Sequence, residues 1–171
     1  MNAKVEQGIN DQIHAEFFSF YLYLSVAAYF TKIHLDGFSH WMRVQSQEEF
    51  GHAMKLFDYL NERGGTVELK ALDAPQTEWE SPAAAVEAVL KHEQYISRRI
   101  NELVDLANKE NDHATTVVMH WYVNEQVEEE ATAETLYHQV KMVESSPHGL
   151  LMIDRELAGR PEPTPISTTE A

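Results

Sequence analysis

Apolar residues recur at intervals of three or four along four long stretches of the chain, which is the spacing of one face of an α-helix. The stretches cover about residues 2–32, 36–63, 81–110 and 113–144. Only seven glycines and six prolines occur, and four of the prolines lie at or after Pro147, so few helix breakers interrupt these stretches. The pattern predicts an all-α fold with four long helices of similar length.

Turn and capping signals indicate how the four helices are connected. Gly64 and Gly65 suit the C-terminal cap and turn of the second helix, and Ser81 followed by Pro82 suits the start of the third. About four residues separate the first two helices and also the last two, so each pair is expected to form an antiparallel hairpin. The connection 64–81, of about 18 residues, is long enough to run back along a helix. These lengths predict a four-helix bundle with one long crossover connection.

A shorter apolar segment follows the four predicted helices. It covers Gly149 to Ala158 and ends before Gly159, which predicts a short fifth helix at the C-terminal end of one domain, residues 1–159. Residues 160–171 hold three prolines, three threonines and a serine but only one apolar aliphatic residue, so a flexible tail is expected there.

Each of the four predicted long helices carries a glutamate within its apolar face. The four glutamates, in chain order, are Glu16, Glu49, Glu93 and Glu129. The first helix also has Tyr23 on the same face. The apolar residues that flank these positions are Ile9, Ile13, Phe20, Ala27, Phe38, Met42, Leu56, Leu60, Val89, Ile96, Ile100, Ala107, Val118, Tyr122, Leu136 and Val140.

The spacing of these polar residues repeats in the two hairpins. The glutamates of the first two helices are 33 residues apart, and the glutamate of the third helix lies 33 residues before Gln126. His52 follows Glu49 by three positions, and Glu129 follows Gln126 by three, so each pair points in one direction from its helix. Glu125 is also expected to face inward. Because buried carboxylates are costly without a cation, the pattern predicts a metal site near mid-height of the bundle.

The ligand types and the composition narrow the identity of the ion. Carboxylates with a single imidazole suit a hard ion, and iron that cycles between Fe(II) and Fe(III) fits better than copper or structural zinc, with manganese left open. The chain has no cysteine, which excludes disulfides, thiolate zinc sites, iron–sulfur clusters and a cysteine nucleophile.

The charge and hydropathy of the chain bear on its partners and location. With 13 Lys and Arg against 28 Asp and Glu, the formal net charge is −15, so nucleic acid and anionic lipid are not expected as partners, whereas metal cations are. No stretch approaches the roughly 20 apolar residues that span a bilayer. No membrane association and a cytoplasmic location are therefore expected.

Four motifs together resemble those of bacterial non-haem ferritins, over residues 1 to about 158. The motifs are His14-Ala15-Glu16-Phe17 with Tyr23, Gln47-Glu48-Glu49-Phe50-Gly51-His52-Ala53, His92-Glu93-Gln94, and Trp121-Tyr122-Val123-Asn124-Glu125-Gln126-Val127-Glu128-Glu129-Glu130. The resemblance implies a ferritin-like bundle that oxidises Fe(II) with dioxygen or peroxide and stores the iron. One motif departs from the pattern of di-iron carboxylate bundles, because Gln-x-x-Glu stands here where a second Glu-x-x-His is expected.

The resemblance also implies roles for individual residues. Those expected to form or line the ferroxidase centre are Glu16, Glu49, His52, Glu93, Gln126 and Glu129. Within this centre the glutamate of the second helix is expected between two iron ions. Glu48, Glu125 and Glu128 are expected to help form a nearby third iron site, and Tyr23 and Trp121 to lie close enough to act as redox partners.

The family forms a homo-oligomeric shell of 24 subunits that encloses an Fe(III) mineral, and residues 149–158 resemble the helix that lines its four-fold channels. Haem-binding relatives place a methionine directly after the glutamate of the Glu-x-x-His motif in the second helix. Here that position is Phe50, and Met54 lies four residues farther on, one helical turn away from the position that binds haem, so no haem is predicted.

Two other functions remain open from the sequence. A di-iron oxidase acting on an organic or radical substrate uses similar ligands, although 171 residues leave little room for a substrate pocket. A metal-free helical interaction bundle leaves the buried glutamates unexplained. Tyr23 and Trp121 are also compatible with ordinary core packing, and Glu48, Glu125 and Glu128 with a solvated helix face.

Overall fold

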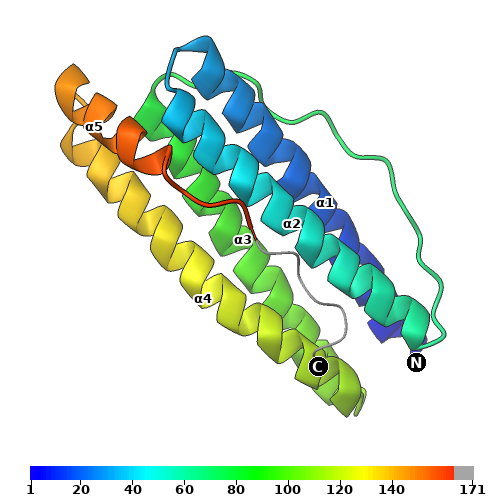
Figure 1. Ribbon diagram of the computed structural model, residues 1–171. Coiled ribbons are helices and arrows are strands. Elements are labelled where there is room, and N and C mark those ends of the chain that lie inside the picture. The colour runs from blue at the N-terminus through cyan, green and yellow to red at the C-terminus, as the bar shows by residue number, and fades with distance from the viewer. Residues whose placement is uncertain (164–171) are drawn as a thin grey trace.

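The computed structural model describes residues 1–163, and within this part of the chain it contains five helices and no strand. The helices are α1 (Ala3–Lys32), α2 (Asp36–Glu62), α3 (Pro82–Lys109), α4 (His113–Met142) and α5 (Pro147–Leu157). The first four lie side by side as a long bundle, and α5 lies across one of its ends (Figure 1). The predicted all-α, four-helix architecture with a short fifth helix is confirmed.

The two hairpins and the crossover between them follow the predicted connectivity. α1 packs mainly on α2, and α3 packs mainly on α4. Residues 64–81 run along the outside of α1 from one end of the bundle to the other (Figure 1). Asn10, near the start of α1, bonds to Thr66 and Glu68, and Lys32, at the end of α1, pairs with Glu78. The crossover is therefore fixed to α1 near both of its ends.

Local signals at the helix ends explain where the helices begin and where α2 ends. Gly64 adopts a left-handed φ of 71° after α2, the conformation for which glycine is favoured. The Ser81 hydroxyl accepts a hydrogen bond from the Ala84 N–H at the start of α3. The same Ser-Pro start recurs at Ser146, whose hydroxyl accepts from the Gly149 N–H. The fifth helix consequently begins at Pro147, two residues before the predicted start at Gly149.

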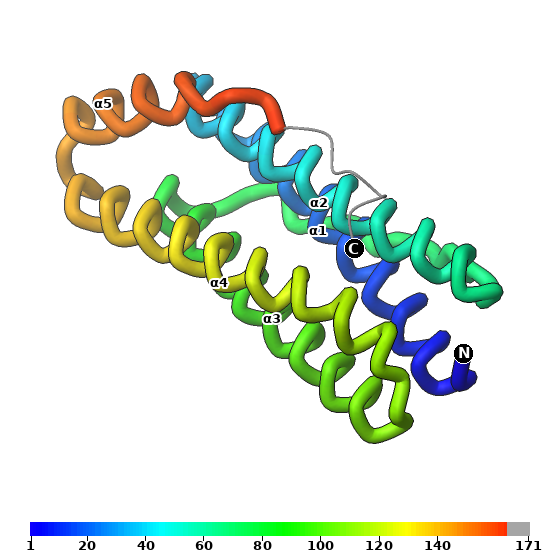
Figure 2. Tube along the Cα trace, turned by 60° about the horizontal axis from the view of Figure 1, so that its bottom comes forward, coloured from blue at the N-terminus to red at the C-terminus, as the bar shows by residue number. Residues whose placement is uncertain are grey.

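The fifth helix supplies the cap that α2 lacks. Leu35, at the N-cap position of α2, makes no side-chain hydrogen bond to the helix. One carboxylate oxygen of Asp154 instead accepts from the N–H groups of Gly37 and Phe38, at 2.8 and 3.0 Å. A Cβ atom at position 37 would overlap the Asp154 carbonyl, so only glycine allows this approach. Figure 2 shows α5 reaching from the end of α4 to the start of α2.

The apolar core is divided into two clusters by a polar layer. One cluster fills the end of the bundle near α5, around Phe30, Phe38 and Val86, and the other fills the opposite end, around Ile9 and Leu60. Of the residues predicted to face the core, Phe20 and Val118 are only half-buried, because each lies at the edge of its helix face. No helix in the described part of the chain combines the length and apolar character needed to cross a membrane.

Candidate metal centre

The polar layer between the two core clusters brings together the six residues predicted for the metal centre. Glu16 and Glu49 are each 1% exposed, and Glu93, His52 and Gln126 are also buried. The Glu129 side chain is 11% exposed and lies at the edge of the layer. Four helices thus contribute polar side chains at one height, since each carries its glutamate in the middle of its apolar face.

The ligand atoms form two overlapping groups. Atoms of Glu16, Glu49 and His52 lie within 4.8 Å of one another, and so do atoms of Glu49, Glu93 and Glu129. Glu49 belongs to both groups and therefore stands between two positions at which an ion can be held. Oxygen donors with one imidazole are ligands that suit iron, manganese or zinc.

Several atoms of this layer lack protein partners. One carboxylate oxygen on each of Glu16, Glu49 and Glu129 is buried without a hydrogen bond. The His52 Nδ1 atom is 3.6 Å from a Glu49 oxygen, and Nε2 is 4.0 Å from a Glu129 oxygen, both beyond ordinary hydrogen-bond distance. Unpaired buried acceptors are costly, and a bound cation would satisfy all three of them.

Burial shifts the titration of these carboxyl groups. It raises the pKa of Glu16 and Glu93 above the usual range and that of Glu49 and Glu129 well above it. The negative charges of Glu93 and Glu16 raise the pKa of Glu49 further, whereas His52 opposes the effect of burial on Glu16. Without a cation these groups keep their protons to a higher pH than free glutamate does, and ion binding opposes that protonation.

Hydrogen bonds from neighbouring side chains fix the orientation of two of the carboxylates. Gln12 donates to Glu16 at 2.8 Å and accepts from the Arg99 guanidinium at 3.2 Å. The Tyr23 hydroxyl donates to one oxygen of Glu93, and the Gln126 amide donates to the other at 3.1 Å. Gln126 in this arrangement positions Glu93 rather than adding a charge to the site.

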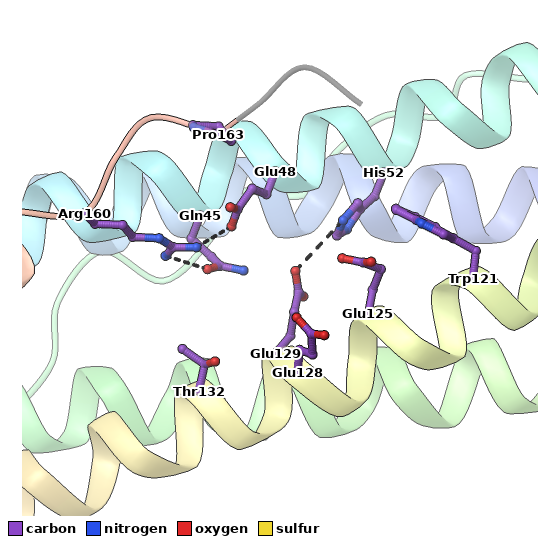
Figure 3. Close-up of a pocket in the computed structure, with 10 residues that line it drawn as sticks. All are labelled: Gln45, Glu48, His52, Trp121, Glu125, Glu128, Glu129, Thr132, Arg160 and Pro163. Carbon is purple, nitrogen blue, oxygen red and sulfur yellow. Dashed lines mark hydrogen bonds and ion pairs between the residues drawn. The ribbon is translucent and has the colours of Figure 1, made fainter. Parts of the chain in front are cut away.

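A cavity of about 240 Å³ lies beside the metal cluster, between α2 and α4 (Figure 3). Glu48, Glu125 and Glu128, the residues predicted for a third iron site, line it together with His52 and Glu129. Burial raises the pKa of Glu125; His52 opposes this shift, and the charges of Glu128 and Glu48 add to it. The structure thus places the three carboxylates next to the buried cluster, open to solvent on one side.

The two predicted redox aromatics occupy different surroundings. Tyr23 is fully buried and bonded to Glu93, inside the polar layer. Trp121 lies at the edge of the cavity (Figure 3), with its ring edge-on to His52 at 5.5 Å between ring centres. The Lys55 ammonium is 4.7 Å from the centre of the Trp121 ring. Both are therefore adjacent to candidate ligands.

Comparison with known proteins places this architecture and these residues in one family. A family model described as the ferritin-like domain matches residues 6–143. The chain belongs to the ferritin family. A bacterial non-heme ferritin of Bacteroides fragilis is 41% identical over 160 residues, covering 94% of this chain and 99% of that protein. One of Staphylococcus haemolyticus is 35% identical over 154 residues, covering 90% and 93%.

Solved ferritin structures superpose closely on this ferritin. An open-pore ferritin from Archaeoglobus fulgidus, 49% identical, gives a TM-score of 0.93 and covers 94% of this chain and 99% of its own. A humanized archaeal ferritin, 48% identical, gives 0.94 and covers 96% and 99%. The resemblance predicted from the motifs is confirmed at the level of the family.

Several residues around the metal cluster of this ferritin were not predicted from the sequence. Gln12 lies four residues before Glu16, a spacing that could have indicated their contact on one helix face. Arg99 and Ser97, which contact Gln12 and Gln126, gave no such signal because their partners lie on other helices. Arg160, the first residue of the predicted tail, bonds to Glu48 and thus lies against α2. The part of that tail from residue 164 onward lies outside the described residues.

Proposed function

We propose that this ferritin is a ferroxidase that stores iron, oxidising Fe(II) with dioxygen or peroxide and depositing Fe(III) mineral inside a shell of 24 identical subunits. The observation that carries the proposal is the position of Glu49, which is shared by two buried ligand groups. Two ions held on either side of one carboxylate can each give up an electron in the same reaction. Membership of a family of iron-storage proteins supports the same conclusion.

The ligand groups divide the work between two ferrous ions. Glu16 and His52 would hold the first ion, Glu93 and Glu129 the second, and Glu49 both. Each ion loses one electron, and the two electrons reduce dioxygen to peroxide, or peroxide to water. Because the pKa values of the carboxyls are raised, ion binding displaces protons within the site, where the reduced oxygen needs them.

Release of the oxidised ions is as important as their binding. The Gln126 amide is neutral and donates to Glu93, so the second ion has neither an imidazole nor an extra carboxylate from this position. Weaker anchoring of Fe(III) allows it to leave for the mineral instead of remaining as a fixed cofactor. Glu48, Glu125 and Glu128 are placed to receive it, which is the role we propose for the third site.

The remaining features of the proposal concern the assembly. A homo-oligomer of acidic chains around a cavity would concentrate Fe(II), given a formal charge of −15 per chain. We place α5 at the channels of this shell and the protein in the cytoplasm, without haem. These statements rest on the family resemblance and on Phe50 following Glu49, where haem-binding relatives have methionine.

Loss of the first ligand group tests the function directly. Glu49→Ala combined with His52→Ala should lower the initial rate of ferric iron formation in air by about 100-fold or more, because neither ion is held correctly. Gln47→Ala is the matched control, since Gln47 is exposed on the same helix and should leave the rate unchanged. Size-exclusion chromatography with iron analysis should show particles of shell size carrying many irons per chain.

Two results would contradict the proposal. An unchanged oxidation rate in the double variant would exclude this site as the ferroxidase centre. A wild-type monomer or dimer that retains only two irons per chain would indicate a di-iron oxidase instead.

A further inference from the structure

The described residues that follow α5 return along α2 and reach the cavity beside the metal cluster. The Arg160 carbonyl oxygen accepts a hydrogen bond from His40 Nε2 at 2.7 Å. The Arg160 guanidinium lies 4.7 Å from the centre of the Trp41 ring and donates to Gln45 at 2.9 Å and to Glu48 at 2.5 Å. Figure 3 shows this side chain reaching into the cavity from the side of α2.

The charges around the cavity give this contact its significance. Glu125, Glu128 and Glu129 face it from α4, and Glu48 faces it from α2. Among the described residues that line the cavity, Arg160 is the one whose positive charge is permanent. Its guanidinium pairs with Glu48, the carboxylate of α2 that lines the cavity. A metal ion would need this carboxylate in order to be bound by carboxylates of both helices.

We propose that Arg160 is a built-in competitor for the third metal site of this ferritin. Its guanidinium must release Glu48 before a divalent cation can bind between that carboxylate and Glu125 or Glu128, because the two cations repel each other at such short range. The inference rests on the proposed function, since it concerns the path by which iron leaves the buried cluster. By competing for Glu48, Arg160 prevents iron from remaining bound at the third site.

The geometry makes the competition reversible. The Arg160 and Glu48 side chains are 22% and 27% exposed, and ion pairs this close to solvent are weak enough for a divalent cation to displace. The base of the segment is fixed independently, because Asp154 caps α2 from within α5. A displaced guanidinium therefore remains tethered close to the cavity and returns when the ion departs.

Zinc binding to the metal-free assembled protein measures the competition without redox chemistry. Titration calorimetry should show two tight equivalents per chain at the buried cluster and a weaker third at the cavity. Arg160→Gln should tighten the third equivalent by about tenfold and leave the first two unchanged, because it removes the competing charge. Arg160→Lys, which retains the charge, should stay within about threefold of wild type.

Two further variants separate competition from a structural effect. Arg155→Gln makes the same charge change at an exposed position of α5 and should leave the zinc titration as in wild type. Glu48→Gln should abolish the third equivalent, and adding Arg160→Gln to it should then change nothing.

The outcomes distinguish this inference from the function on which it rests. If Arg160→Gln leaves the third equivalent as weak as in wild type while the first two bind normally, Arg160 does not compete and the ferroxidase proposal stands. If Arg155→Gln tightens the third equivalent equally, the effect is general electrostatics and the inference is wrong. If Glu49→Ala with His52→Ala retains the first two equivalents, the proposed metal centre itself is wrong.

Discussion

The two helical hairpins have the same geometry but different chemistry. In α1 and α2 the sequence places Glu16, Glu49 and His52, whereas the corresponding positions of α3 and α4 are Glu93, Gln126 and Glu129, with the same separation of 33 residues. The first hairpin supports its own ligand directly, because Gln12 bonds to Glu16 within α1, and Arg99 from α3 in turn donates to Gln12. The second depends on both hairpins, because Tyr23 from α1 and Gln126 from α4 hold Glu93.

The glutamine at position 126 gives the second hairpin a different ligand set from the first, although the two hairpins have the same fold. At position 126 the amide donates a hydrogen bond where a carboxylate would accept or bind an ion. The histidine of the metal cluster, His52, comes from the first hairpin and acts on carboxyl groups of both hairpins. His52 opposes the effect of burial on the pKa of both Glu16 and Glu129, while the charges of Glu49 and Glu93 add to the effect of burial on Glu129.

The largest expected effect on the oxidation rate comes from replacing Glu49, the ligand shared by both ion positions, and it should exceed the effect of replacing Gln126. Glu49→Gln should lower the ferrous oxidation rate by about 100-fold or more, because both ion positions lose a carboxylate. Gln126→Ala should lower it by no more than about tenfold, because Glu93 keeps its bond from Tyr23. Stopped-flow measurement of ferric iron formation compares the two. Equal losses would mean that Gln126 is itself an essential ligand.

A pH series on the metal-free protein tests the titration of the buried carboxyl groups that both hairpins contribute. The four buried carboxyls have raised pKa values, so the folded chain binds more protons than the unfolded chain, and stability falls as the pH rises. Burial lowers the pKa of His92 to about 4, which acts in the opposite direction, but only below about pH 6.5. Above that pH the His92 contribution is gone, and Glu49 and Glu129, whose pKa values are raised furthest, should dominate the slope.

The measurement is the unfolding midpoint in denaturant at pH 6.5 and pH 8.5, at one protein concentration. Each unit of pKa shift carried through this range corresponds to about 1.4 kcal/mol. Glu129→Gln should remove more of the slope than Glu16→Gln, because the pKa of Glu129 is raised further. Saturating zinc should abolish the slope. A midpoint that rises with pH in the metal-free protein would contradict the account.

Restoring a carboxylate to the second hairpin should make the two hairpins more alike. Gln126→Glu should hold the second ferric ion more tightly and slow recovery of fast oxidation, after a first dose of two Fe(II) per chain, by about tenfold. The metal-free variant should also be less stable by about 1–3 kcal/mol, because a donor to Glu93 becomes a second buried carboxyl. Gln94→Glu adds the same charge at an exposed site of α3 and should recover as wild type does. Recovery of Gln126→Glu at the wild-type rate would refute the release mechanism.

The smallest effect concerns a bond that joins the hairpins through the backbone. The Tyr122 hydroxyl donates to the His52 carbonyl oxygen at 2.7 Å and touches no ligand atom through that bond. Tyr122→Phe should therefore lower the free energy of unfolding by about 1 kcal/mol and leave the oxidation rate within about twofold of wild type. A much larger loss of rate would show that the bond positions His52 for catalysis.

The fold was predictable because its signals are local and repeated. Helix faces, the Gly64 turn and the Ser81 cap each follow from a few neighbouring residues, and the length of the crossover fixes how the hairpins join. The position of the buried glutamates was predictable for the same reason, since helical periodicity places them on the inward face. The start of α5 was wrong by two residues, although the Ser-Pro signal of α3 was present there too.

Contacts between distant segments were not predictable. Asp154 caps α2 from more than a hundred residues away, and Arg160 reaches Glu48 from a segment whose composition predicts a tail. The hydrogen-bonding role of Gln126 also depends on which oxygen of Glu93 faces it across the bundle. Such pairs are set by how the helices cross, which a single sequence does not encode in any local pattern.

The division of the apolar core into two clusters bears on whether the fold depends on the bound ions. Small zinc domains lose their structure when they lose their ion, because the ion is most of what holds them. Here packed side chains clamp the bundle above and below the ion layer, so ions can arrive and depart while the helices keep their places. Binding and release of the ions are thereby independent of the folding of the helical bundle.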